Sequence, residues 1–266
     1  MGYDNRPIGI FDSGVGGLTV LAEVKKNLPH ESTIYVGDTA NVPYGGKSPE
    51  VLLRHGRDII RFLQNQDVKA IVLACGTTSS TVYEDLAKEF PHIPLVDVIR
   101  PGVKACVKLK IPRLGIIATA ATIKSGLFAH LIKTQAPGIH LEAQACPIFA
   151  PMIESGITRG SIAEWAIETY IGHWQGKIDA LVLGCTHYPL LTGALTHVLG
   201  KSMQYVNLAE HTTQALKSLL VAKNIQSDST CQARHKFYVS GNPEAFNKTA
   251  HILLRDSPNA TKISWT

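Results

Sequence analysis

The amino-acid sequence predicts an α/β fold with two similar lobes, whose parallel sheets face each other across a central cleft. Short, continuously apolar runs alternate with amphipathic stretches, as in parallel strands connected by helices. Two strand-and-loop segments also recur along the chain, which favours two related halves. At roughly 100–200 residues per domain, a chain of 266 residues forms one large domain or two small ones.

The elements follow from the hydrophobic pattern. The predicted strands are Ile8–Phe11, Ile34–Val36, Lys69–Cys75, Pro94–Val98, Arg113–Ala118, His140–Ala145, Ile178–Leu183 and Lys236–Val239. The predicted helices between them include Gly17–Leu28, Pro49–Gln64, Ile123–Lys133, Ser161–Trp174 and Leu208–Lys223. Ser48 before Pro49 is typical of a helix start, because serine caps free amide groups and proline suits the first helical position.

The internal repetition involves two pairs of segments. Lys69–Thr77 (KAIVLACGT) resembles Asp179–His187 (DALVLGCTH), and the cysteines of the two segments lie 110 positions apart. Pro7–Ser13 (PIGIFDS) resembles Arg113–Thr119 (RLGIIAT), with glycines 106 positions apart. The similar offsets favour a duplicated α/β unit, although short strand–helix units also resemble one another by chance. In a duplicated fold, each lobe contributes one cysteine loop at the carboxyl end of its sheet.

The composition excludes several classes of protein. With 45% apolar and 18% charged residues, the chain does not match a disordered protein. The net charge of +5 comes from scattered basic residues, so we expect no nucleic-acid partner. No apolar stretch approaches the ~18 residues of a membrane span. The polar segment Met1–Arg6 lacks the core of a signal peptide, and we expect no membrane partner.

The chain has five cysteines, an odd number, and no Cys-x-x-Cys pair, which argues against a disulfide framework or a zinc site. We therefore expect a reduced, cytoplasmic setting and no bound metal. Cys106 lies in a helical pattern, Cys146 lies directly before a proline, and Cys231 lies in a polar loop. We interpret all three as structural or incidental. Cys75 and Cys185 differ because each lies at the end of an apolar strand.

The segment Asp12–Gly17 (DSGVGG) directly follows the first predicted strand. Its glycines permit a tight turn, and the following helix offers free amide groups to an anion. The full dinucleotide-binding fingerprint is absent, so a carboxylate-binding loop is the favoured interpretation and a plain turn is the alternative.

The two cysteine loops carry the chemistry. Cys75 precedes small and hydroxyl residues at a predicted helix start, where a thiolate is stabilised. Cys185 lies two residues before His187, which can act as its proton partner. The alternative for either cysteine is a buried structural residue. Two thiols facing one small site suit the removal of a proton from one face of a carbon and its delivery to the other. This inverts a stereocentre without a cofactor, provided that preorganised donors stabilise the charge that develops.

Together these segments resemble the glutamate racemase family, within the cofactor-independent aspartate/glutamate racemase superfamily. The matching segments are Ile8–Leu18, Tyr35–Gly45, Ile71–Cys75 with Thr77, Cys146–Glu154, Leu183–Leu191 (LGCTHYPLL) and Phe237–Phe246. The resemblance implies a cofactor-independent enzyme that supplies D-glutamate for bacterial peptidoglycan. It also implies a first lobe of residues 1–98 plus 212–266 and a second lobe of residues 99–211. Both a monomer and a homodimer are compatible with the sequence.

The resemblance assigns residues to this activity. Cys75 matches the base that takes the proton of D-glutamate, and Cys185 the base that acts on L-glutamate. Asp12 and His187 match residues that assist the first and second thiol, and Glu154 matches a carboxylate near the second. The substrate contacts implied are Asp12, Ser13, Tyr44, Gly45, Gly76, Thr77, Thr119, Thr122, Thr186 and His187. By residue type alone, Thr119 and Thr122 are equally suited to capping a helix, and Glu154 to lying in solvent.

The first cysteine loop departs from the family pattern. It usually reads Cys-Asn-Thr-Ala, whereas here Gly76 stands in place of the asparagine. A lost hydrogen bond to a charged ligand costs about 1.5–3 kcal/mol. Asn41 also replaces an arginine common in that family, and we expect a smaller effect there.

Several functions remain as alternatives. A related racemase that acts on aspartate or another small dicarboxylate is the nearest, and Gly76 is the feature that leaves it open. A non-catalytic regulator and a cysteine hydrolase are further alternatives. The retained Cys75, Cys185 and Asp12 argue against the regulator, and no clear triad supports the hydrolase.

Overall fold

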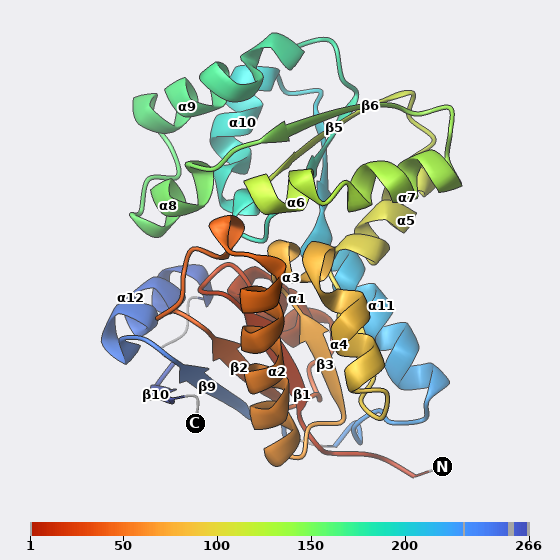
Figure 1. Ribbon diagram of the computed structural model, residues 1–266, viewed down its shortest axis with the longest axis vertical. Coiled ribbons are helices and arrows are strands. Elements are labelled where there is room, and N and C mark those ends of the chain that lie inside the picture. The colour runs from red at the N-terminus through yellow and green to blue at the C-terminus, as the bar shows by residue number, and fades with distance from the viewer. Residues whose placement is uncertain (1, 231, 255–257, 265–266) are drawn as a thin grey trace.

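The computed structural model describes residues 2–230, 232–254 and 258–264. Within these ranges the strands form two sheets, one of six strands and one of four, and all paired strands are parallel. The two sheets lie one above the other, with helices around each, as the sequence predicts (Figure 1). No helix in the described ranges is long and apolar enough to cross a membrane.

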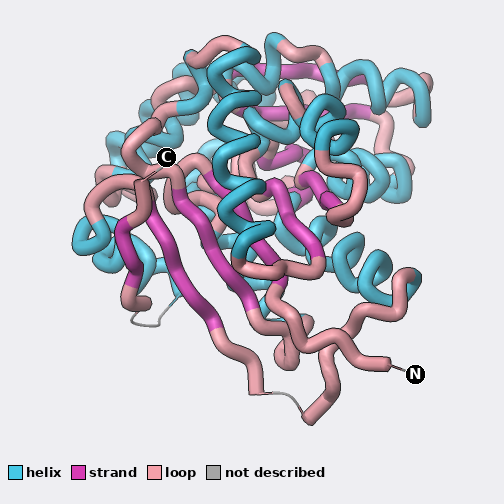
Figure 2. Tube along the Cα trace, turned by 60° about the horizontal axis from the view of Figure 1, so that its bottom comes forward, coloured by secondary structure: helices cyan, strands magenta, loops and turns pink. Residues whose placement is uncertain are grey.

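The six-stranded sheet has the order β10-β9-β2-β1-β3-β4. Its strands are β1 (Ile8–Asp12), β2 (Thr33–Gly37), β3 (Ala70–Leu73), β4 (Leu95–Asp97), β9 (His235–Val239) and β10 (Ala260–Lys262). They run side by side in Figure 2. Every residue of β1, β2 and β3 is buried, because helices cover both faces of the sheet centre. Pairing of β9 with β2 brings the end of the chain back to the first sheet.

The four-stranded sheet has the order β6-β5-β7-β8. Its strands are β5 (Arg113–Ala118), β6 (His140–Ala145), β7 (Ala180–Leu183) and β8 (Gln204–Asn207). The central strands β5 and β7 are apolar and buried, whereas β6 lies at an edge and is largely exposed. One continuous cluster of buried apolar side chains reaches from Ile8 and Val72 to Leu114 and Val182, and so fixes the two sheets relative to each other.

The helices connect the strands. They are α1 (Leu18–Asn27), α2 (Pro49–Asn65), α3 (Gly76–Thr81), α4 (Tyr83–Glu89), α5 (Ile99–Leu109), α6 (Ala120–Lys124), α7 (Leu127–Gln135), α8 (Phe149–Glu154), α9 (Ser161–Ile171), α10 (Thr192–Leu199), α11 (Leu208–Ala222) and α12 (Pro243–Leu254). Short 3-10 helices lie at Tyr44–Gly46, Gly172–Trp174 and Tyr188–Leu191. Helix α2 begins as predicted, with the Ser48 hydroxyl accepting a hydrogen bond from the Val51 amide.

The predicted strands are all present, but one helix prediction was wrong. The expected helix Ile123–Lys133 is divided into α6 and α7, because Gly126 adopts a φ of 67° and ends the first helical turn there. Strands β8 and β10 were not predicted. Both lie at sheet edges, where few residues are buried and the apolar pattern is weak.

A buried ion pair holds the base of the six-stranded sheet. Lys69 Nζ lies 2.6 Å from Glu31 Oε2, and both side chains are almost fully buried. The ammonium group also donates to the Asp4 carbonyl and to Ser227 Oγ, while the Ser227 amide and hydroxyl donate to Glu31. The pair therefore joins the N-terminal segment, the start of β3 and the chain after α11.

Removal of one partner from this pair is expected to destabilise the protein strongly. Lys69→Ala leaves the Glu31 carboxylate buried without its cation, which costs about 3–5 kcal/mol. Urea unfolding at pH 7 measures this loss. The double variant Lys69→Met/Glu31→Gln is the control, because it removes both charges, and we expect it to lose much less. A loss below about 1 kcal/mol in Lys69→Ala contradicts the prediction.

Candidate active site

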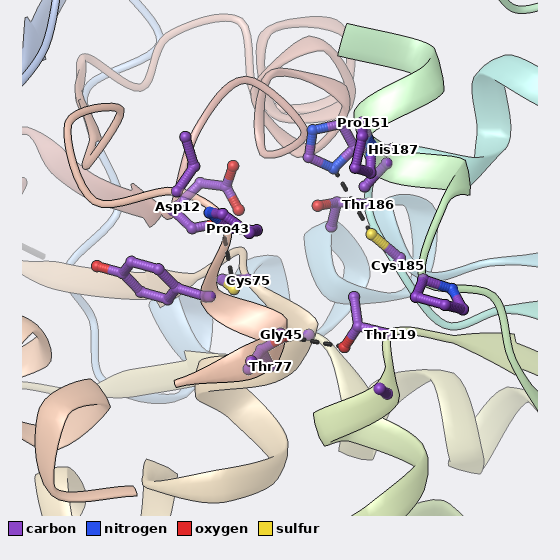
Figure 3. A pocket seen from close by; sticks show the side chains of 18 of the residues that line it. Asp12, Pro43, Gly45, Cys75, Thr77, Thr119, Pro151, Cys185, Thr186 and His187 are labelled. Carbon is purple, nitrogen blue, oxygen red and sulfur yellow. Dashed lines mark hydrogen bonds between the residues drawn. The ribbon is translucent and has the colours of Figure 1, made fainter. Parts of the chain in front are cut away.

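The loops at the carboxyl ends of both sheets line one cavity of about 260 Å³. The residues around it come from the loops after β1, β2 and β3 and from those after β5, β6 and β7. They are Asp12, Ser13, Val42, Pro43, Tyr44, Gly45, Gly46, Cys75, Gly76, Thr77, Thr119, Ala120, Pro147, Ala150, Pro151, Glu154, Cys185, Thr186 and His187. Cys75 and Cys185 face the cavity from opposite sides (Figure 3).

Cys75 lies between β3 and α3. Its Sγ lies 3.6 Å from Ser13 Oγ, and the residue is only 6% exposed. Burial raises the pKa of Cys75, the neighbouring Asp12 carboxylate raises it further, and hydrogen bonds with Thr78 and Ser13 oppose the shift. Cys75 is therefore a protonated thiol at neutral pH.

Asp12 ends β1 and lines the cavity together with the first cysteine. Its Oδ2 accepts a hydrogen bond of 2.9 Å from the Gly14 amide. Burial raises the pKa of Asp12, and the positive charge of His187 and the amides of Gly17 and Gly14 counteract the rise. A buried carboxyl with a raised pKa can exchange a proton with a neighbouring group at lower cost than an ordinary aspartate.

Cys185 follows β7 and has a different environment. Its Sγ lies 3.6 Å from His187 Nδ1, and His187 Nε2 lies 3.0 Å from Glu154 Oε1. Burial alone lowers the pKa of His187, but hydrogen bonds with Cys185 and Glu154 outweigh it and hold that pKa well above its ordinary value. The two cysteines thus have different neighbours: Cys185 has a histidine linked to a carboxylate, whereas Cys75 has the Ser13 hydroxyl and the Asp12 carboxyl.

The raised pKa of His187 predicts a pH-dependent contribution to stability. A group whose pKa is higher in the folded state stabilises fully below its ordinary pKa of 6.5, and this contribution is lost as the pH rises through the folded value. The difference in free energy of unfolding between the unchanged chain and His187→Asn should therefore shrink above pH 6.5. Urea unfolding from pH 6 to 8.5 measures it. A difference that stays constant or grows with pH contradicts the assignment; His130→Asn, at an exposed position of α7, is the control.

Threonines join the two sides of the cavity. The hydroxyls of Thr77 and Thr119 lie 3.0 Å apart across the cleft. Thr119 also donates to Thr122 and caps α6 through the Thr122 amide, so one residue both caps a helix and lines the cavity. Thr122 is buried behind Thr119 and does not line the cavity itself.

The Tyr44 hydroxyl is engaged in a hydrogen-bond network around Asp38. It donates a hydrogen bond of 2.5 Å to Asp38 Oδ2, and Ser240 and Asn41 donate to the same carboxylate. This network fixes the loop that carries Gly45, and it includes a residue of the returning C-terminal segment. The Asn41 side chain is thus used within the fold.

Apolar and small lining residues were not predicted. Val42, Pro43, Gly46, Ala120, Pro147, Ala150 and Pro151 complete the cavity wall. Their residue types carry no chemical signal, and only the resemblance of the segments Tyr35–Gly45 and Cys146–Glu154 pointed near them. No group of three or more His, Cys, Asp or Glu side chains suited to a metal ion occurs in the part of the chain that the structure describes.

Cys106 and Cys146 lie away from the cavity lining, in the apolar core. Burial raises the pKa of Cys106 to about 12 and raises that of Cys146 as well, so both remain protonated. Cys231 lies outside the described residues.

Comparison with known proteins identifies the family of this chain. Residues 18–215 match the family described as Asp/Glu/Hydantoin racemase. The chain is 41% identical to a glutamate racemase of Geobacter metallireducens, over 94% of this chain and 93% of that protein. It is 36% identical to one of Streptococcus sanguinis, over 98% and 99% of the two chains. A crystal structure of the Francisella tularensis glutamate racemase with D-glutamate superimposes with a TM-score of 0.92, at 34% identity and with 98% of each chain covered. Two opposed cysteine loops in one cavity, full-length similarity and the same fold together show that this chain belongs to the glutamate racemases of the Asp/Glu/Hydantoin racemase family.

Proposed function

We propose that this chain interconverts L- and D-glutamate by a two-base mechanism that uses no cofactor. One observation carries the proposal: Cys75 and Cys185, from different sheets, line the same cavity, and each has its own polar partners. The cavity has room for a small amino acid, and its hydroxyl and amide groups suit a dicarboxylate.

The proposed reaction moves one proton at each face of the α-carbon. With L-glutamate, the Cys185 thiolate removes the α-proton, and the electron pair is delocalised into the α-carboxylate. The Cys75 thiol then donates its proton to the opposite face of the same carbon. D-glutamate follows the reverse path, so the thiol and the thiolate exchange places in each turnover.

In this proposal, the remaining lining groups bind the substrate and stabilise the charge that develops on it. Ser13, Thr77, Thr119 and Thr186 supply hydroxyls, and the loop at Tyr44 and Gly45 supplies backbone groups to the substrate carboxylates and the charge developing on one of them. Asp12 assists Cys75, whereas His187, in contact with Glu154, assists Cys185. Thr122 acts through Thr119, because it lies behind it.

The wider setting is also a proposal. We infer that the D-glutamate produced is used for peptidoglycan, in the cytoplasm of a bacterium. We propose lobes of residues 1–98 plus 212–266 and of residues 99–211; pairing of β9 with β2 supports the return of the chain to the first lobe.

Circular dichroism of purified protein with L- or D-glutamate, without added cofactor, tests the function. Loss of the signal from either enantiomer towards a racemic mixture is the expected result. A parallel series with aspartate and other small dicarboxylates separates the proposed substrate from its nearest alternative. A stable glutamate signal, with racemisation of aspartate alone, contradicts the proposed substrate.

A further inference from the structure

The second cysteine loop, residues 184–187, rests directly on the backbone of two glycines from the other side of the cleft. A Cβ atom added to Gly76 would lie 2.7 Å from the Gly184 carbonyl oxygen. A Cβ atom added to Gly16 would lie 2.3 Å from His187 Nδ1. Real Cβ atoms essentially never approach other atoms closer than 3.0 Å, so neither position accepts a side chain without movement.

A hydrogen bond fixes the same loop from the same side. Thr19 Oγ1, in the first turn of α1, donates to the Thr186 carbonyl at 3.0 Å. The loop is therefore contacted by the backbone of Gly16 and Gly76 and by the hydroxyl of Thr19, and none of these residues belongs to its own sheet. Residues 16, 19 and 76 together form what we call the loop seat.

Contacts with β5 restrict movement of the Gly184 carbonyl away from Gly76. The Gly184 amide donates to the Ile117 carbonyl of β5 at 2.8 Å. On that side, a Cβ atom added to Gly184 would itself lie 2.8 Å from the same Ile117 oxygen. Gly184 is thus held between β5 and Gly76, and any displacement moves Cys185, which is the next residue, or the whole four-stranded sheet.

We infer that the loop seat sets the position of Cys185 relative to Cys75. Gly76, as part of this seat, is therefore a positioning residue for the proposed racemisation. The inference rests on that proposed function. The family resemblance leads us to expect an asparagine at this position. In this structure the Gly184 carbonyl lies where the side chain of that asparagine would begin. Gly76→Asn should therefore not restore a missing substrate contact; it should separate the two thiols and lower activity.

The test measures racemisation and thiol accessibility in the same variants. Gly76→Ala and Gly76→Asn are expected to lower kcat/KM for glutamate by about 100-fold, because a displacement of about 1 Å between reacting groups has an effect of this size. The loss must be equal in both directions, since the two enantiomers have equal free energy. We also expect faster iodoacetamide labelling of Cys185 relative to Cys75, read by peptide mass spectrometry, because the loop is pushed away from its seat.

Two further variants keep the test decisive. Gly193→Ala, in α10 of the same half, adds a Cβ atom with nothing within 4 Å and should leave activity and labelling unchanged. Thr19→Val removes the hydrogen bond to Thr186 without added bulk, and should raise Cys185 labelling even if the Gly76 variants do not fold. The inference is overturned if Gly76→Ala has the activity and the Cys185 labelling of the unchanged chain. If Gly76→Ala does not fold, unchanged Cys185 labelling in Thr19→Val overturns it. Absence of racemisation by the unchanged chain contradicts the proposed function instead, and the labelling comparison then still tests the seat.

Discussion

Cys75→Ser and Cys185→Ser are each expected to lower glutamate racemisation by about 10²–10⁴-fold in both directions, the usual contribution of a positioned acid or base. A serine hydroxyl has nearly the same shape as a thiol but is a far weaker acid, so it can neither remove the α-proton nor exist as the anion. Because the proposed mechanism needs one group on each face, either loss alone should stop turnover. Circular dichroism of each enantiomer measures the rate.

Cys106→Ser is the matched control for these variants. It makes the same atomic change at a buried cysteine outside the cavity lining, and we expect it to retain the rate. Thermal unfolding of all three variants shows that each is folded. Full activity in Cys75→Ser or in Cys185→Ser rejects the assignment of that thiol.

The second large effect is expected at Asp12. Asp12→Asn keeps the shape of the side chain and an oxygen that can accept from the Gly14 amide, but it removes the group that can take up a proton beside Cys75. We expect kcat for glutamate to fall by about 100-fold, with the protein still folded. Steady-state kinetics with both enantiomers measure it.

Glu154→Gln provides the comparison on the opposite side. Its carboxylate contacts His187 and not a thiol, and it is about one-third exposed, so we expect a fall in kcat of about tenfold. An equal or greater loss in Glu154→Gln than in Asp12→Asn argues against the direct role of Asp12.

Local patterns were sufficient to predict the framework of the site. The central strands β1, β3, β5 and β7 are short apolar runs buried on both faces, and such runs are recognisable without tertiary information. The two-sheet arrangement followed from the internal repetition. Since the carboxyl ends of parallel strands lie at one edge of a sheet, the loops of Cys75 and Cys185 could be expected near each other.

The remaining features depend on approaches between distant segments, which local patterns do not encode. The glycine at position 76 was read as the loss of a side chain, whereas in the structure the Gly184 carbonyl occupies that space. The dual contacts of Thr119 and the burial of Lys69 against Glu31 likewise arise from packing of segments far apart in sequence. At Gly126 a single residue with positive φ interrupts an amphipathic pattern that predicted one continuous helix.

Racemisation of L-glutamate in D₂O, followed at early times by mass spectrometry of the separated enantiomers, tests the central claim that two thiols act on opposite faces of one carbon. The donor thiol exchanges with solvent, so the D-glutamate formed should carry deuterium at the α-carbon. The L-glutamate that remains should keep its proton, because the base that removes it does not return a solvent deuteron to the same face. Equally rapid deuterium entry into the remaining L-glutamate, or a product that retains the original α-proton, contradicts the two-base account.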